Sequence, residues 1–236
     1  MRYYYDLHIH TALSPCGNED MTPNNIVNMA LLKELDIIAI TDHNSAENVA
    51  AVVNVAKNTP LLVIPGMEIE TAEEVHIVAL FPSIKAVQVM QEWVYETLPP
   101  LQNRVDIFGA QRILNAEDEM IGENPRLLLT ATSLPLKETL NRIQALHGVG
   151  IPAHVDRNSY SILSNLGAFP PDLYIPTIEI SKHLPLSEGQ QQFRQKKVIQ
   201  SSDAHYLGDI AEAINYLDLP SRTIEALLEY LSQRKE

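Results

Sequence analysis

The sequence lacks most features that would commit it to an extracellular, membrane or polyanion-binding role. Its 236 residues include one cysteine, Cys16, which excludes an intramolecular disulfide. No apolar run reaches the 18 or so residues of a membrane span, and the first residues do not resemble a signal peptide. Lysine and arginine number 17 against 30 aspartates and glutamates, giving a formal net charge of -13. This charge repels polyanions, so we do not expect the protein to bind duplex nucleic acid. From the missing disulfide, signal peptide and membrane span we predict a cytoplasmic protein that does not bind a membrane.

Several widespread nucleotide and catalytic motifs are also missing. The chain has no G-x-x-x-x-G-K-[ST] phosphate loop, no G-x-G-x-x-G fingerprint and no G-x-S-x-G elbow. Nucleotide-triphosphate hydrolysis, Rossmann cofactors and serine-hydrolase chemistry are therefore not expected. The length and a hydrophobic content of 45% allow one large domain with a substantial core.

Short apolar runs alternate with amphipathic stretches along most of the chain, which is typical of repeated βα units and predicts an α/β fold. About seven or eight strands are expected, so one barrel domain over residues 1–236 is more economical than two domains. Between about residues 84 and 135 the pattern changes, and we expect a helical insertion or cap. The predicted strands are 3–8, 36–41, 61–68, 75–81, 150–155, 177–181, 197–202 and 213–217, and the predicted helices are 22–35, 44–57, 84–98, 136–146, 160–166, 186–193 and 222–231.

Histidines and carboxylates recur where these strands end, which is where functional residues of a parallel α/β barrel collect. His8 and His10 end the first strand, and their i, i+2 spacing puts both side chains on one side of an extended segment. Asp203 and His205 repeat this spacing after the strand 197–202. Asp42, His43, Glu68 and His154 follow the same rule at other predicted strands, whereas His76 lies at the start of its strand.

Mixed imidazole and carboxylate ligands suit Zn, Mn or Fe, whereas Mg and Ca prefer oxygen ligands alone. A single histidine at a strand end is more often a hydrogen-bonded structural residue, but the whole set at strand ends favours metal. Eight potential ligands are too many for one ion, and a carboxylate such as Glu68 can bridge two ions. We therefore predict a centre of two or three divalent ions held by His8, His10, His43, Glu68, His76, His154, Asp203 and His205.

Other polar residues receive different interpretations. His147 follows a predicted helix, where a cation complements the helix dipole. His183 is expected to be a solvated loop residue, with a place in the pocket as the alternative. Glu179 and Ser181 on the strand 177–181 are candidates to face inward, beside the ligands or the substrate.

Six motifs between Asp6 and His205 resemble, in their order, those of the PHP (polymerase and histidinol phosphatase) superfamily: D-L-H-I-H-T-A-L-S, I-T-D-H-N-S, G-M-E-I, H-I-V-A-L-F, P-A-H-V-D-R and S-S-D-A-H. The resemblance implies a distorted (β/α)7 barrel and a phosphoesterase centre, most similar to small stand-alone members resembling 3',5'-nucleotide bisphosphate phosphatases. It implies one ion on His8, His10, Glu68 and Asp203, a second on Glu68, His76 and His154, and a third on His43 and His205.

The chain departs from such relatives near the implied third ion. Pro15 stands where nucleotide-phosphatase relatives often have an acidic residue. Cys16 stands where histidinol-phosphatase relatives can present a histidine, so it is either a thiolate ligand or a small buried packing residue. Relatives also carry a substrate-recognising insertion, for which residues 84–135 would be the counterpart. Arg157 is placed to hold a phosphate through two parallel hydrogen bonds, unless it is an exposed surface residue.

The expected reaction is hydrolysis of a small phosphomonoester, such as a 3',5'-bisphosphonucleotide, by water activated between two ions. Arg157 would help to neutralise the phosphoryl group, and His205 or His43 would protonate the leaving group if the third ion is absent. Histidinol phosphate and the end of a short oligonucleotide are alternative substrates. An alternative from another class is a non-catalytic, metal-binding regulatory module. The sequence leaves the native metal, the substrate and the oligomeric state open.

Overall fold

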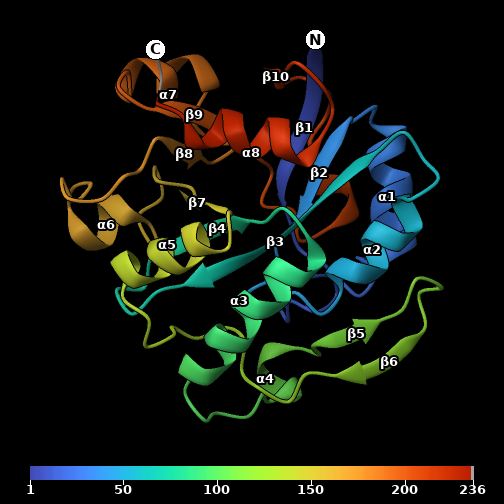
Figure 1. Cartoon of the computed structure of the whole chain (residues 1–236). Helices are drawn as coiled ribbons and strands as arrows, with labels where there is room; N and C mark the ends of the chain where they lie inside the picture. Colours follow the sequence, from blue (N-terminus) through green and yellow to red (C-terminus); the bar gives the residue numbers. More distant parts are fainter. Residues whose placement is uncertain (235–236) are drawn as a thin grey trace.

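A computed structural model describes residues 1–234 and shows strands arranged around a distorted barrel (Figure 1). These strands are β1 (Arg2–Ile9), β2 (Ile37–Ile40), β3 (Leu62–Glu70), β4 (His76–Leu80), β7 (Val149–Pro152), β8 (Thr177–Ile180), β9 (Lys197–Gln200) and β10 (Tyr216–Asp218). One curled sheet has the order β10-β1-β2-β3-β4-β7, and β8 pairs with β9 in parallel. The ring closes where the Val155 amide donates to the Glu179 carbonyl (2.9 Å) and the His10 amide donates to the Ala204 carbonyl (3.0 Å). The predicted distorted (β/α)7 barrel is thereby confirmed.

Strand β4 runs against both of its neighbours in the ring. It pairs antiparallel with β3, where His76 lies opposite Glu70, and antiparallel with β7. The first residue of β4 therefore lies at the end of the barrel where the parallel strands finish. This reversal places His76 among residues that come from the C-terminal ends of other strands.

Strand β1 changes partners halfway along its length, which distorts the barrel. Its first residues pair antiparallel with β10, with Arg2 opposite Asp218. Its last residue instead forms a parallel bridge with Ala204, which follows β9. The end of β1 and the segment after β9 are thus held side by side, and both carry residues of the predicted metal centre.

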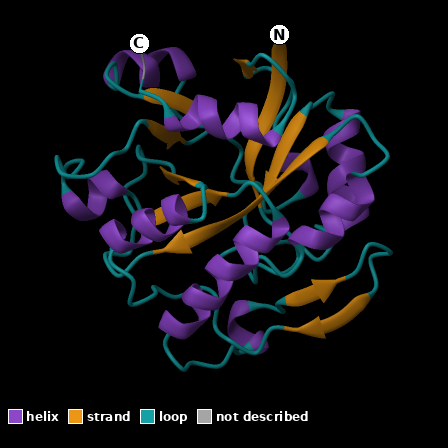
Figure 2. Ribbon diagram, viewed as in Figure 1, coloured by secondary structure: helices purple, strands orange, loops and turns teal. Residues whose placement is uncertain are grey.

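Helices cover the outside of the barrel (Figure 2). They are α1 (Pro23–Leu32), α2 (Val49–Ala56), α3 (Ile84–Thr97), α5 (Leu136–Ala145), α6 (Ile162–Leu166), α7 (Leu186–Gln192) and α8 (Ile224–Ser232), with a short 3-10 turn η1 (Leu207–Asp209). The helix predicted over residues 44–57 begins only at Val49. Asn44 has a left-handed φ of 48°, and the side-chain amide of Asn48, the N-cap residue, donates to the Thr11 hydroxyl and the Arg112 carbonyl. Among the described helices, none has the length and apolar character needed to cross a membrane.

The segment between β4 and β7 is only partly helical, so the prediction of a helical insertion is wrong for its second half. After α3 come the single turn α4 (Val105–Phe108) and an antiparallel hairpin of β5 (Arg112–Leu114) and β6 (Met120–Glu123). The side chain of Asn115 orders the hairpin turn by accepting from the amides of Glu117 and Glu119. Strands this short show too little alternation to be recognised in the sequence.

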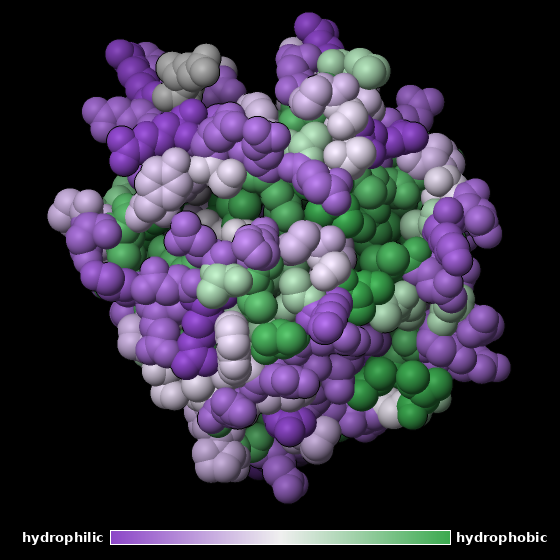
Figure 3. Space-filling view, viewed as in Figure 1, coloured by the Kyte–Doolittle hydropathy of each residue, from purple (hydrophilic) through white to green (hydrophobic). Residues whose placement is uncertain are grey.

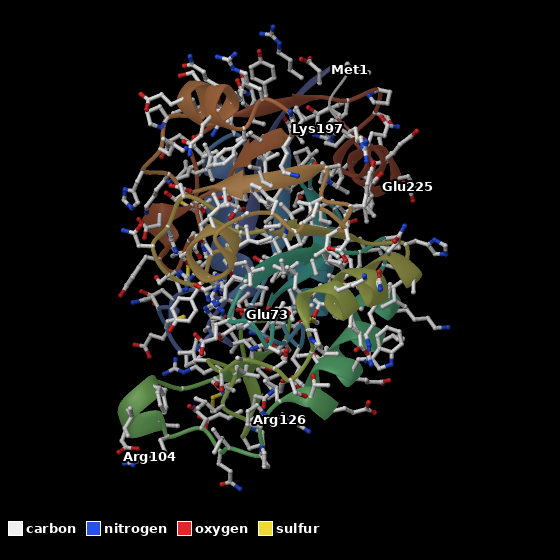
Figure 4. The ribbon with its side chains drawn as sticks, turned by 90° about the vertical axis from the view of Figure 1, so that its left-hand side faces the viewer. Met1, Glu73, Arg104, Arg126, Lys197 and Glu225 are labelled. Atoms are coloured by element: carbon white, nitrogen blue, oxygen red, sulfur yellow. The ribbon has the colours of Figure 1, made fainter. Side chains whose placement is uncertain are left out.

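The insertion lies at the end of the barrel that the C-terminus of β1 faces. Figure 4 shows Arg104 and Arg126, both from the insertion, at the opposite end of the molecule from Met1. Hydrophobic side chains are exposed over the hairpin (Figure 3), where Met120 and Ile121 are largely open to solvent. The insertion therefore stands beside the strand ends that carry the predicted ligands.

Candidate metal centre

The structure brings all eight predicted ligands together at one end of the barrel. Seven of the eight form three overlapping candidate metal-binding groups within residues 1–234, and in each group the ligand atoms all lie within 4.8 Å of one another. His154 lies outside these groups, but its Nε2 is 3.3 Å from Glu68 Oε1. The groups are His8, His10, Glu68 and Asp203; His43, Glu68 and His76; and His10, His43 and His205.

Glu68 is the hub of the cluster and is almost fully buried. Burial alone would raise the pKa of this carboxyl, but the imidazoles of His76, His8 and His43 hold it well below its usual range. The residue is therefore a carboxylate surrounded by imidazoles, an arrangement suited to a bridging ligand. Its oxygens lie 2.8 Å from His76 Nδ1, 3.0 Å from His43 Nδ1, 3.3 Å from both His8 Nε2 and His154 Nε2, and 3.5 Å from His10 Nε2.

Asp203 joins the cluster from the segment after β9. Its Oδ1 lies 3.4 Å from His8 Nε2 and 3.2 Å from His10 Nε2. Although burial opposes ionisation, these two histidines keep the pKa of Asp203 well below its usual range. Asp203 and His154 both adopt left-handed backbone conformations, with φ of 52° and 33°. Such conformations cost about 1–3 kcal/mol each in non-glycine residues and persist where the surroundings hold them, as at functional sites.

Several buried atoms of the cluster have no hydrogen-bond partner within residues 1–234. They include the Nε2 atoms of His8 and His10 and the Oε2 atom of Glu68. A buried polar atom without a partner costs about 1–3 kcal/mol, and such atoms are uncommon in folded proteins. Here the unpartnered nitrogen and oxygen atoms face one another, and this donor set suits Zn, Mn or Fe. The residues present therefore fit a centre of divalent ions.

The Nδ1 atoms of His8 and His10 contact supporting side chains. His8 Nδ1 lies 2.9 Å from Glu179 Oε1, so Glu179 does face inward. His10 Nδ1 lies 2.9 Å from the hydroxyl of Ser14, which donates to Asp42 Oδ1 at 2.7 Å. Supports of this kind fix the orientation of a ligating imidazole and leave its second nitrogen for the metal. Asp42 is thus a supporting residue and belongs to none of the candidate ligand groups in the described chain.

Replacing Glu179 by glutamine is expected to weaken metal binding by about 10- to 100-fold, because the buried carboxylate no longer stabilises the orientation of His8. Competition with a chromogenic chelator during titration of the metal-free protein measures this affinity. Glu188→Gln on α7 is the matched control, since its side chain is exposed. Equal affinities of the two variants would show that Glu179 does not support the centre.

Cys16 lies beside the third group of ligands. Burial of its sulfur opposes ionisation, but hydrogen bonds from His205 and His43 lower the pKa of the thiol to about 6. The residue also has an exposed surface, so its interpretation as a small buried packing residue is wrong. Burial opposes protonation of both imidazoles, but nearby groups raise their pKa values. Glu68 and Cys16 raise the pKa of His43, and Cys16 and Asp203 raise the pKa of His205.

Two cavities open next to the cluster, and Arg157 lines both. The guanidinium Nη1 of Arg157 is 2.7 Å from Asp203 Oδ2, so this residue belongs to the edge of the centre. His183 lines the cavity of about 530 Å3, in agreement with its alternative interpretation, although its side chain is exposed. His147 follows α5 with a φ of 57° and lines neither cavity.

The second cavity, of about 400 Å3, lies directly over the cluster and is partly lined by residues that the sequence analysis missed. Glu70 is one of them, and its i, i+2 spacing from Glu68 was a signal that could have identified it. The others come from loops and from the insertion, where no periodic pattern marks them. The missed lining residues are Glu70, Phe108, Leu129, Ser159 and Tyr160.

Comparisons with solved structures show the same fold. Endonuclease Q from Pyrococcus furiosus matches 98% of this chain at 18% identity with a TM-score of 0.72. A complex of endonuclease Q with a 27-mer duplex containing an abasic lesion also matches 98% of this chain at 18% identity, with a TM-score of 0.74. This chain spans 56% of the length of those proteins. A protein from Bifidobacterium adolescentis assigned as a metal-dependent phosphoesterase has 19% identity and a TM-score of 0.60, with 94% of this chain and 95% of that chain covered.

An amidohydrolase from Chromobacterium violaceum with bound SO4 has 17% identity and a TM-score of 0.57, and the match covers 96% of each chain. No curated protein matches the sequence. The family model described as the PHP domain matches residues 6–231, which include every residue of the cluster. The chain therefore belongs to the PHP domain family.

Proposed function

We propose that this chain is a metal-dependent phosphoesterase that hydrolyses a small phosphomonoester, with a nucleotide such as a 3',5'-bisphosphonucleotide as its substrate. The observation that carries the proposal is the buried ligand cluster around Glu68, which opens into a cavity of about 400 Å3. Membership of the PHP domain family and the fold shared with an assigned phosphoesterase support it. A structural metal site would be closed, whereas an open cavity leaves room for a substrate at the centre.

The ligand assignment follows the groups in the cluster. His8, His10, Glu68 and Asp203 would hold one ion, Glu68, His76 and His154 a second, and His43 and His205 a third, with Cys16 beside them. Divalent ions bound there would acidify a water molecule and offset the negative charge of the phosphoryl oxygens.

The residues at the edge of the centre have roles of their own in this proposal. Arg157 reaches from Asp203 into both cavities, so its guanidinium can hold a phosphate oxygen while the ester bond lies over the cluster. His43 and His205 line the cavity of about 400 Å3 over the cluster. If they hold no third ion, either imidazolium can donate a proton to the leaving alkoxide. Unchanged turnover of a His205→Gln variant with intact metal content would remove that role from His205.

A nucleic-acid substrate is the second candidate, because the endonuclease Q complex with a duplex carrying an abasic lesion shares the fold at a TM-score of 0.74. Two observations on this chain favour a small ester instead. The net charge is -13, and Arg157 is the one lysine or arginine in the described lining of the cavity over the cluster. A track for a phosphodiester backbone needs more cations than this.

Release of inorganic phosphate from a panel of esters tests the proposal. The panel contains 3',5'-bisphosphonucleotides, nucleoside monophosphates and histidinol phosphate, each with Mn added or withheld. Short oligoribonucleotides and a duplex with an abasic site are followed by gel, because cleavage of a phosphodiester bond releases no inorganic phosphate. Mn-dependent phosphate release from a mononucleotide supports the proposal, cleavage of the duplex alone favours the second candidate, and no reaction with any of them contradicts both.

A further inference from the structure

The cavity over the cluster has a hydrophobic part that the hydrolytic reaction does not use. Besides the metal-ligand candidates and Arg157, its lining includes Phe108, Leu129 and Tyr160. Phe108 and Leu129 come from the insertion, whereas Tyr160 follows the segment that carries His154 and Arg157. Two aromatic rings therefore share a cavity of about 400 Å3 with the metal centre.

Tyr160 presents an exposed ring on a fixed backbone. Its ring stacks on that of His76, with centroids 4.9 Å apart and an interplanar angle of 26°. Its carbonyl accepts a hydrogen bond from the His76 amide (3.0 Å), and its backbone has a left-handed φ of 54°. The side chain nevertheless remains 48% exposed. An exposed aromatic ring on a constrained backbone, directly beside a candidate ligand, is placed to contact a bound substrate.

Phe108 is held at the cavity in a comparable way from the insertion. It ends α4, where its amide donates to the Arg104 carbonyl at 2.8 Å. The next residue, Gly109, has a φ of 96°, and a Cβ at this position would collide with the carbonyl oxygen of Pro15. The side-chain amide of Asn103 also donates to the Gly109 carbonyl (2.8 Å). These contacts fix the backbone of Phe108 against the loop before Cys16, while its ring remains 37% exposed.

We infer that Phe108 and Tyr160, with Leu129, form a subsite for the planar base of a nucleotide whose phosphate lies at the metal centre; this inference rests on the proposed function. Bases stack readily on aromatic side chains because every base has a flat π-face. A sugar phosphate without a base has no flat π-face to stack on these rings. The subsite therefore selects mononucleotides over phosphate esters of the same charge that lack a base.

The test compares two ligands that differ only in the base: the non-hydrolysable phosphonate analogues of AMP and of ribose 5-phosphate. Calorimetry on the Mn-loaded protein is expected to show about tenfold tighter binding of the AMP analogue. Phe108→Ala and Tyr160→Ala should each reduce this preference about fivefold or more, while binding of the ribose analogue stays unchanged. Tyr160→Phe, which retains the ring, should keep the preference.

Ile107→Ala is the matched control, since Ile107 lies on the same turn, is 56% exposed and does not line the cavity. Metal content is measured for every variant, so that an indirect effect of Tyr160 on His76 is detected. Equal binding of both analogues by the unmodified protein, or an undiminished preference in both alanine variants, overturns the inference even if mononucleotides are hydrolysed. Failure of the proposed function would show separately, as absence of phosphate release from every ester.

Discussion

Replacing Glu68 by glutamine is expected to lower phosphate release by at least about a thousandfold. Loss of metal-based catalysis is worth several kcal/mol, which corresponds to that factor. Glu68 contacts five imidazoles and is the one carboxylate that belongs to two of the three candidate ligand groups found among residues 1–234. A neutral amide cannot compensate the charge of two ions. The measurements are kcat/KM with the best ester of the panel and metal content by elemental analysis.

Glu70→Gln is the control for this prediction, because Glu70 lies two residues along β3 and lines the same cavity. It belongs to none of the candidate ligand groups formed by residues 1–234. Circular dichroism should show that both variants are folded. Retention of more than about a tenth of the activity by the Glu68→Gln variant, with full metal content, would contradict the bridging role of Glu68.

Divalent ions are expected to raise the melting temperature of the metal-free protein by about 5–10 °C. The Nε2 atoms of His8 and His10 and the Oε2 atom of Glu68 have no hydrogen-bond partner within residues 1–234, and a bound metal ion would give them one. An ion present at about 100 times its Kd stabilises the folded state by about 2.7 kcal/mol. In a chain of this size each kcal/mol shifts the melting temperature by roughly 2–4 °C. Thermal scans with Zn, Mn and Mg measure the shift.

Mg is the internal control in these scans, because a centre rich in imidazole binds it weakly. An equal shift with Mg, or no shift with any ion, would show that the cluster is not the binding site expected here. A large shift with Zn or Mn, but without hydrolysis of any ester, would instead support the non-catalytic, metal-binding module.

The positions of the metal-ligand candidates could be predicted because barrel topology links a place in the sequence to a place in space. His8, His10 and Glu68 lie at or near the C-terminal ends of apolar strands that are readily recognised in the sequence. His76 lies at the start of its strand, and only the antiparallel direction of β4 brings it to the same end. The local pattern of the chain does not determine the direction of a strand, so the position of His76 depends on the sheet topology.

Contacts between distant segments could not be predicted in this way. Glu179 reaches His8 across the barrel, and nothing near either residue specifies the pairing. The hairpin in the insertion depends on the Asn115 turn and on strands of three and four residues, which are too short for a periodic signal. Phe108 enters the cavity because Gly109 packs on Pro15, a contact between segments about 90 residues apart in the sequence.

The most direct test of the account is a titration of the metal-free protein with Mn or Zn in which bound ions per chain and phosphate release from a mononucleotide are measured on the same samples. Activity is expected to be absent without metal, to rise as the centre fills and to reach its maximum only with at least two ions per chain. Full activity without metal, or a fully loaded protein that releases no phosphate from any ester, would contradict it.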